Sequence, residues 1–330
     1  MCEYVNAALA QATWAKYKSG WHAFCEFEEA TQSANRWPLS AVSVREFTTW
    51  CLAVKKLQPA SVRTYLSALK LVHTLKGFSD APGLKDKTVE LILIGAKNLA
   101  IANPPQPNSR RVVTLPLLKL IGHRIAESDW ADLSKQAVWT ACAVAFFSSA
   151  RLGELLARSE TDFDPTSDLT WDQVIFTGSE SALIKLRIPK SKDCEGETLD
   201  LFPFEGACCP LEAMRRLSRL QAETGMRSPT LPVFRLANGK NLTVAKLNRI
   251  LSGLLRDICE KGENSISCHS FRAGIPSALA RFPELASSEE VKGWGRWSSD
   301  CYKKYARLKV DRKKAIFRKI SLAVSRVANS

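Results

Sequence analysis

Residues 137–155 read AVWTACAVAFFSSARLGEL, and this stretch predicts the centre of a folded domain. Residues 137–149 are apolar nearly all round, a pattern typical of a helix that other elements cover on every side. Arg151 follows almost directly, and a charge at the end of so apolar a segment needs a partner because an unpaired buried charge is costly. Glu154 could supply that partner through an ion pair, and a bound ligand is the alternative.

After this helix the hydrophobic pattern changes from helical to strand-like. Residues 174–177 are typical of a strand, and residues 184–188 alternate between apolar and basic side chains as a half-buried strand does. Residues 197–202 alternate less cleanly. A polar hairpin loop, PKSKDCEG, lies between the last two segments and carries Lys192, which by itself indicates a solvated turn. From Pro210 onward the sequence predicts helices to the end of the chain.

The first hundred residues predict a helical domain. One helical face carries aromatic residues at spacings of three and four: Trp14, Tyr17, Trp21 and Phe24. Ser43 with Glu46 predicts a capping box that opens a second helix. Pro59 fits the first turn of a third helix, and residues 88–102 form a fourth, densely apolar segment. Together these segments indicate a four-helix core.

A proline-rich linker separates this region from the rest of the chain. The segment NPPQPNS has three prolines in seven residues and cannot continue a helix. Arg110 and Arg111 follow it, and such a pair could track a phosphate backbone or form an ordinary solvated charge pair. The predicted organisation is a helical domain at 1–102, a linker at 103–112 and a second domain at 113–330.

Composition narrows the class of protein. The chain has 330 residues, of which 45% are hydrophobic and 24% charged, as in soluble globular proteins of about two domains. We expect no membrane span, because no run of about 18 uncharged apolar residues occurs, and no secretory signal. The ten cysteines include no CxxC pair, which argues against a zinc site. Cys51 and Cys142 are expected to be buried thiols in a reducing compartment.

Charge is the first informative deviation from average composition. The formal net charge is +14 and the sequence pI is near 9.4. Lys and Arg exceed Asp and Glu by 12 to 8 before the linker prolines near residue 105 and by 35 to 25 after them. A basic excess in both parts raises the odds of a shared polyanionic partner, most often nucleic acid.

Two further segments carry residue types suited to phosphate chemistry. In HSFR, His269 and Arg272 stand three apart and would share a helical face. A proton donor beside a fixed guanidinium suits the charged transition state of a phosphate, although a solvated pair is the alternative. The segment GWGRWSSD precedes Tyr302 and Tyr305, and its two Trp residues could instead be core anchors at a turn.

In this order the segments resemble the tyrosine recombinase (integrase) family over nearly the whole chain. ARLGEL is similar to the family's first Arg box, HSFR to its His-x-x-Arg box and GRWSSDCYKKYAR to its Tyr box. The last wording looks closest to recombinases of eukaryotic Crypton and DIRS-like mobile elements. The resemblance implies a mainly α fold with a small antiparallel β-sheet (α+β), in which a helical, SAM-like core-binding domain precedes a mixed catalytic domain.

The resemblance also implies a role for each matching residue. Tyr305 would attack the scissile phosphate and form a 3′-phosphotyrosine. Arg151 and Arg272 would grip the non-bridging oxygens, with Glu154 bracing the active-site arginine without doing chemistry. The remaining members are implied to handle protons or donate hydrogen bonds: Lys192 would protonate the leaving 5′-oxygen, His269 would assist at the tyrosine, and Trp297 would donate where many members have a second histidine.

Two departures bear on these assignments. Trp297 and Tyr305 are eight residues apart, whereas nine is the commoner family interval, which makes Tyr302 a rival nucleophile. Lys190 is the alternative to Lys192, which we favour because it lies nearer the loop tip and matches the family's wording.

A C-terminal apolar stripe could pack on its own domain or on a neighbouring protomer. It comprises Ile316, Phe317, Ile320, Val324 and Val327.

The implied activity is that of a site-specific DNA recombinase or transposase working through a Holliday junction in the nucleus. Its implied partners are double-stranded DNA and further copies of the chain, a dimer at each site and a tetramer in the synapse. No metal, cofactor, membrane or small-molecule substrate is expected. A type IB topoisomerase and a domesticated protein that only binds DNA are the alternatives. The recognised DNA sequence is not encoded in any motif.

Overall fold

A computed structural model of the chain describes residues 3–9, 11–33, 37–78, 81–102, 112–186, 197–258, 266–280, 285–295, 316 and 318–319. The chain divides into two compact units, residues 1–107 and 108–330, which are here called the first and second unit. The division falls within the proline-rich segment between the helical regions. Among the residues described, no helix is long and apolar enough to cross a membrane.

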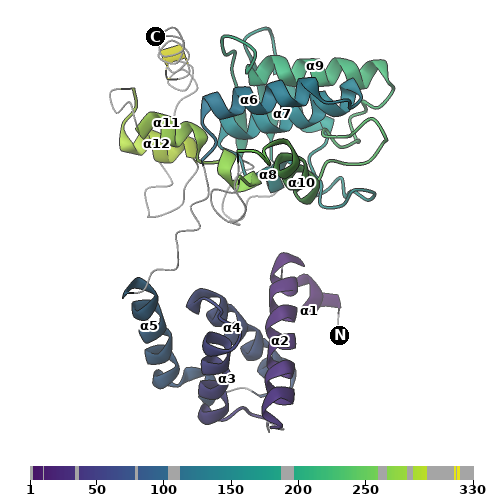
Figure 1. Cartoon of the computed structure of the whole chain (residues 1–330). Coiled ribbons are helices and arrows are strands. Elements are labelled where there is room, and N and C mark those ends of the chain that lie inside the picture. The colour runs from purple at the N-terminus through teal and green to yellow at the C-terminus, as the bar shows by residue number, and fades with distance from the viewer. Residues whose placement is uncertain are drawn as a thin grey trace. The chain divides into compact units, whose positions relative to one another are not determined.

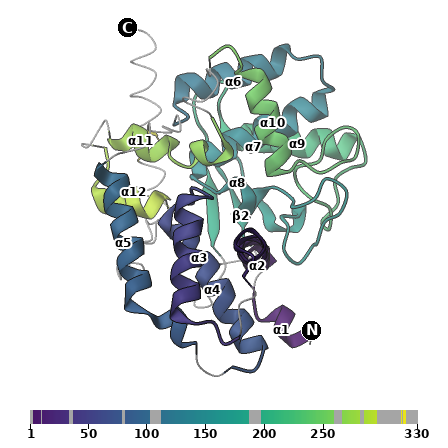
Figure 2. The ribbon, with the colours of Figure 1, turned by 60° about the horizontal axis from the view of Figure 1, so that its bottom comes forward.

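The first unit is built from helices alone in its described part (Figure 1). They are α1 (Glu3–Ala7), α2 (Gln11–Thr31), α3 (Ala41–Ala53), α4 (Pro59–Leu75), the 3-10 helix η1 (Pro82–Lys85) and α5 (Lys87–Ala102). Helix α2 packs on α4, and α3 packs on both α4 and α5. Figure 2 shows α3 and α4 lying side by side within this unit.

Local sequence signals explain where these helices begin. Pro59 is the first residue of α4, as the sequence predicts. The predicted capping box at Ser43 and Glu46 is wrong, because α3 begins one turn earlier. The hydroxyl of Ser40 accepts a hydrogen bond from the Ser43 backbone N–H at 3.1 Å, so Ser40 is the N-cap.

Aromatic rings fill the core of the first unit. Phe24, Phe27 and Phe47 are almost fully buried, and the ring centroids of Phe24 and Phe47 lie 5.3 Å apart in an edge-to-face arrangement. His73 is also buried, and its Nε2 accepts a hydrogen bond from the Leu39 N–H at 3.2 Å. The expectation that the aromatic face of α2 packs inward is confirmed at Phe24.

The second unit mixes helices with one small sheet. Its helices are α6 (Leu115–Glu127), α7 (Asp132–Ser148), α8 (Leu152–Leu155), α9 (Pro210–Glu223), α10 (Val244–Leu254), α11 (Gly274–Ala280) and α12 (Ser288–Gly295), with 3-10 helices η2 (Trp171–Gln173) and η3 (Cys268–Phe271). Helix α7 contacts both α6 and α9, and residues 140–150 are all buried. The prediction of a central buried helix is therefore confirmed.

The sheet has three antiparallel strands in the order β1-β2-β3. They are β1 (Val174–Thr177), β2 (Ser181–Lys185) and β3 (Thr198–Leu201). Ile184 pairs with Val174 on one side and Leu199 on the other, so the apolar positions line up across the strands. The predicted fold class, mainly helical with a small antiparallel sheet, is confirmed.

The prediction of helices from Pro210 to the end of the chain is wrong in one part. Helix α9 ends at Glu223 and α10 begins at Val244, and the chain between them makes turns and isolated bridges. Pro229, Pro232 and two glycines with positive φ lie in this stretch, and both residue types interrupt helices. Further on, Ile316 is fully buried in the core of the second unit.

Candidate active site

The candidate site is built at the C-terminal end of α7. Helix α7 ends at Ser148, and Ser149 adopts a left-handed conformation with φ 51° and ψ 29°. This turn stops the helix and releases backbone carbonyls that have no partner within it. Ser149 is fully buried, and its hydroxyl has no hydrogen-bond partner among the described residues. The end of α7 is therefore an acceptor-rich, negatively polarised position inside the core.

Arg272 brings a positive charge to this position. Its side chain is buried, with 4% of the residue exposed, and its Nη1 donates to the Ser149 carbonyl at 3.3 Å. The two residues are 123 positions apart in the sequence. Burying a guanidinium is costly unless hydrogen bonds compensate it, and the helix end provides such an acceptor. Arg272 thus contacts Ser149, which lies two positions before Arg151 in the sequence.

Arg151 leaves the same helix end and is fixed by Glu154. One carboxylate oxygen of Glu154 accepts from Arg151 Nη1 at 2.7 Å, and the other accepts from the Arg151 backbone N–H at 3.0 Å. This double contact restrains both the side chain and the main chain of Arg151. The expected ion pair is present, yet 41% of the Arg151 side chain remains exposed, so the paired guanidinium is still accessible.

The segment that carries His269 and Arg272 is anchored from two sides. The Asn248 side chain on α10 accepts from the Cys268 N–H at 2.8 Å, which fixes the start of η3. At the other end, a Cβ added to Gly274 would stand 2.4 Å from the Phe146 ring, so only glycine fits against α7. His269 is exposed, whereas Arg272 is buried, and the Arg272 N–H donates to the His269 carbonyl at 3.2 Å.

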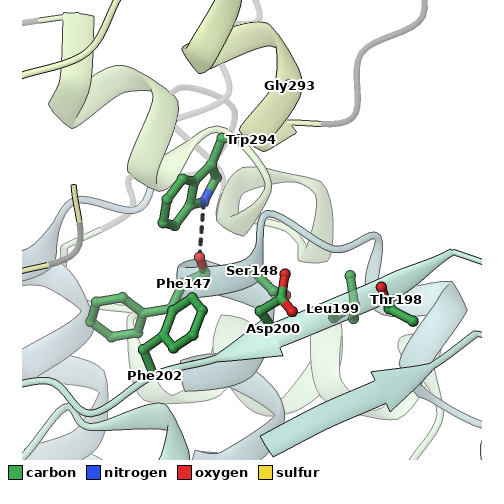
Figure 3. A pocket seen from close by; sticks show the side chains of 8 residues that line it. All are labelled: Phe147, Ser148, Thr198, Leu199, Asp200, Phe202, Gly293 and Trp294. Carbon is green, nitrogen blue, oxygen red and sulfur yellow. Dashed lines mark hydrogen bonds between the residues drawn. The ribbon is translucent and has the colours of Figure 1, made fainter. Parts of the chain in front are cut away.

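Trp294 adds a third contact at the end of α7. Its indole N–H donates to the Phe147 carbonyl at 3.0 Å, and the residue is 93% buried, with 7% exposed. Figure 3 shows the indole standing over the end of α7, beside strand β3. A pocket opens here. It is lined by Phe147, Ser148, Thr198, Leu199, Asp200, Phe202, Gly293 and Trp294. Because β3 follows directly after the segment that carries Lys192, the pocket adjoins that segment in sequence.

Several of the predicted site residues lie outside the described residues. These are Arg110, Arg111, Lys192, Trp297 and Tyr305, together with the rivals Lys190 and Tyr302. Of the predicted set, the structure describes Arg151, Glu154, His269 and Arg272. It joins Arg151 to Glu154 directly and brings Arg272 to the turn from which Arg151 departs.

Sequence reasoning missed two parts of this arrangement. For the hydrogen bond from Trp294 to Phe147, the only signal was the sequence GWG, which indicated a core anchor at a turn. Asn248 had no signal at all, because it stands on a separate helix 20 residues before its partner. Both are contacts between elements distant in the sequence, which local patterns do not encode.

The described cysteines are thiols, and four of them, Cys51, Cys142, Cys208 and Cys268, are buried, which makes them poorly reactive. Burial raises the pKa of Cys268 to about 12, and it also raises the pKa of Cys142. The expectation that Cys51 and Cys142 are buried is confirmed. Within the part of the chain that the structure describes, no group of three or more His, Cys, Asp or Glu side chains could hold a metal ion.

The fold of this chain is that of tyrosine recombinases and integrases. A λ integrase tetramer bound to a Holliday junction matches with a TM-score of 0.54 at 12% identity, covering 92% of this chain and 77% of that one. A λ integrase dimer bound to a core site matches at 0.52 and 13%, covering 94% of each chain. XerH recombinase in a post-cleavage complex matches at 0.51 and 12%, covering 95% and 78%. Neither a protein-family model nor a curated protein matches the sequence.

Proposed function

We propose that this chain is a site-specific DNA recombinase that cuts and rejoins strands through a tyrosyl phosphodiester. The observation that carries the proposal is the convergence at the end of α7. Arg151 leaves this end, Arg272 donates to the Ser149 carbonyl, and Trp294 donates to the Phe147 carbonyl. Two sequence segments that resemble recombinase motifs, ARLGEL and HSFR, therefore meet at one place, and Trp294, which directly precedes the segment GRWSSDCYKKYAR, donates to the same helix end. The fold is one that recombinases share.

The chemistry we propose needs positive charge at a fixed point. Tyr305 would attack phosphorus through its oxygen, the bond from phosphorus to the 5′-oxygen would break, and Lys192 would protonate that oxygen. His269 would take part in moving the tyrosine proton. Arg151 and Arg272 would neutralise the non-bridging oxygens, and each such preorganised donor typically contributes about 2.7–4 kcal/mol to the transition state.

The double contact of Glu154 fits this role for Arg151. A long side chain that must meet a phosphate loses conformational entropy on binding, unless another group already restrains it. Glu154 holds both the guanidinium and the backbone N–H of Arg151 while leaving the guanidinium accessible. The pair thus preorganises the charge, and Trp297 would add a hydrogen-bond donor at the same phosphate.

The partners we propose are duplex DNA and further copies of the chain. The matched λ integrase structures are a dimer on a core site and a tetramer on a Holliday junction. The net charge of +14 supplies affinity for the phosphate backbone, and this affinity should fall steeply with salt. Membership of a Crypton or DIRS-like mobile element and action in the nucleus belong to the same proposal, and they rest on the resemblance of the motifs.

The test is covalent capture of DNA without metal. Nicked duplexes with a randomised region are incubated with protein in EDTA and resolved on a denaturing gel, and the trapped DNA is sequenced. Wild-type protein should give a shifted covalent band that Tyr305→Phe abolishes, because phenylalanine lacks the attacking oxygen. Tyr302→Phe is the matched control and should keep the band.

Each other outcome points elsewhere. A band that persists in Tyr305→Phe and disappears in Tyr302→Phe would identify Tyr302 as the nucleophile. Salt-sensitive binding with no band on any DNA would indicate a DNA-binding relic. Efficient relaxation of supercoiled plasmid by a monomer, without pairing of two sites, would indicate a topoisomerase instead.

A further inference from the structure

Trp294 connects a short helix to the end of α7. Trp294 is the last residue but one of α12, and its indole N–H reaches the Phe147 carbonyl at 3.0 Å. A carbonyl in the last turn of a helix has no partner within that helix. The indole bond therefore serves as a side-chain cap on α7, and at the same time it fixes α12 to the turn that carries Arg151 (Figure 3).

The other end of α12 is fixed as well. The Ser287 hydroxyl accepts from the Glu290 N–H at 3.2 Å, and a Glu290 carboxylate oxygen accepts from the Ser287 N–H at 2.8 Å. This reciprocal capping box holds the start of the helix. Helix α12 also packs on α11, which in turn contacts α7. Helix α12 is therefore held at both ends.

We propose that Trp294 is a positioning residue for the nucleophile, which it aligns by fixing α12 to the end of α7. Tyr305 follows Trp294 by eleven positions in the sequence. The arginines and the tyrosine must meet the same phosphorus, and a misplacement of about 1 Å can cost about 100-fold in rate. This inference rests on the proposed function, because it assumes that Tyr305 is the nucleophile.

The chemistry allows this role to be separated from that of the arginines. Strand cleavage needs both the tyrosine and the phosphate-binding groups. Joining of a strand that ends in a 3′-(4-nitrophenyl) phosphate needs the latter alone. In joining, a 5′-hydroxyl attacks phosphorus, the bond to 4-nitrophenolate breaks, and the hydroxyl proton passes to the group that protonates this oxygen during cleavage. Tyr305→Phe protein can therefore be assayed for joining through the release of 4-nitrophenolate.

The decisive variant is Trp294→Phe, which keeps an aromatic ring but removes the N–H donor. We expect covalent cleavage at saturating DNA to slow by between about 10- and 100-fold. Joining in the Tyr305→Phe background should change by less than about threefold when Trp294→Phe is added, since Arg151 and Arg272 stay in place. Equal losses in both reactions, or no loss in either, would overturn the proposal.

Trp171→Phe is the matched control. Trp171 is also buried in the second unit, and its indole N–H donates to the Gln221 side chain at 2.7 Å, away from the end of α7. The same substitution at Trp171 removes a comparable hydrogen bond and should leave the rates of both cleavage and joining unchanged. If Trp171→Phe slows cleavage as much as Trp294→Phe does, the effect is a general loss of packing and the proposal fails.

A second variant covers the case in which Trp294→Phe does not fold. Ser287→Ala removes one half of the capping box at the exposed start of α12. It should slow cleavage by a larger factor than joining, and an equal loss in both reactions would contradict the proposal. Failure of the proposed function has a different signature, because wild-type protein would then form no covalent adduct at all.

Discussion

The two compact units bury different kinds of side chain. In the described part of the first unit, the core is made of aromatic and aliphatic residues, and the buried polar residues are Thr48 and His73. The second unit buries more polar side chains, and three of them, Ser148, Ser149 and Arg272, lie at the end of α7. Apolar burial stabilises a fold, whereas buried charge costs stability unless it is compensated. Under the proposed function, this contrast assigns stability to the core of the first unit and the chemistry to the buried charge of the second.

The largest effect we expect comes from the aromatic core of the first unit. Phe24→Ala removes a ring that is fully buried against Phe27 and Phe47. Replacing a buried Phe by Ala typically costs about 3–5 kcal/mol, a large share of the stability of one domain. Hydrogen exchange of peptides from α2 and α4 should show this loss of protection, while peptides from α7 should keep theirs.

A control on the same unit makes the comparison quantitative. Leu91 is 66% exposed on α5, and Leu91→Ala should change stability by less than about 0.5 kcal/mol. If Phe24→Ala left the protection of α2 and α4 unchanged, the first unit would not depend on its aromatic core. If it instead lowered the rate of cleavage at saturating DNA, the division of roles between the units would be wrong.

The next effect concerns the buried charge of the second unit. Arg272→Met introduces an apolar side chain of similar length and removes the guanidinium that donates to the Ser149 carbonyl. Methionine avoids the cost of burying a charge, and this gain offsets the loss of the hydrogen bond to the Ser149 carbonyl. Cleavage should slow by about 100- to 1,000-fold, while the thermal melting temperature changes little. Rates of covalent adduct formation and calorimetry measure the two quantities on the same protein.

Arg249→Met provides the matched control for this variant. Arg249 is exposed on α10 and pairs with Glu160 at 3.0 Å, so its loss removes a charge without entering the core. It should weaken DNA binding at most slightly and leave the cleavage rate at saturating DNA unchanged. A cleavage rate in Arg272→Met equal to that of wild type would show that the buried guanidinium serves the fold alone.

Periodicity in the sequence predicted which elements exist better than where they begin and end. Strand β1 occupies residues 174–177 as predicted, because its sequence VIFT consists of β-branched and aromatic residues. The start of α3 was misplaced, since the serine that caps it, Ser40, precedes the predicted one by three residues. Helix was wrongly extended over 224–243, where prolines and glycines interrupt an otherwise ordinary composition.

In the candidate site, contacts between residues close in the sequence could be predicted, whereas contacts between distant elements could not. The Arg151–Glu154 pair was predictable, because partners three apart belong to one turn. The left-handed turn at Ser149 was not, since serine has no preference for positive φ. Nor could the sequence show that Arg272 and Trp294 donate to the carbonyls of Ser149 and Phe147 at the end of α7, more than a hundred residues away. These contacts depend on tertiary packing.

The smallest effect we expect is a pH dependence confined to the first unit. Desolvation by burial lowers the pKa of His73 from its ordinary value of 6.5. The folded unit therefore favours the neutral ring, whose Nε2 accepts from the Leu39 N–H. Its contribution to stability is complete above pH 6.5, because the ring is then neutral in both states. Below that pH the unfolded chain binds the proton first, so stability is lost as the pH falls towards the folded pKa.

His73→Gln tests this directly, because the glutamine side-chain oxygen can accept from Leu39 but does not titrate. Hydrogen exchange of α4 peptides between pH 7 and pH 5 should show an acid-dependent loss of stability in wild-type protein that the variant lacks, after correction for intrinsic exchange rates. His22→Gln changes an exposed histidine on α2 and should keep the wild-type dependence. An equal acid response in the second unit would contradict the comparison, since it would place the buried titrating group outside the aromatic core.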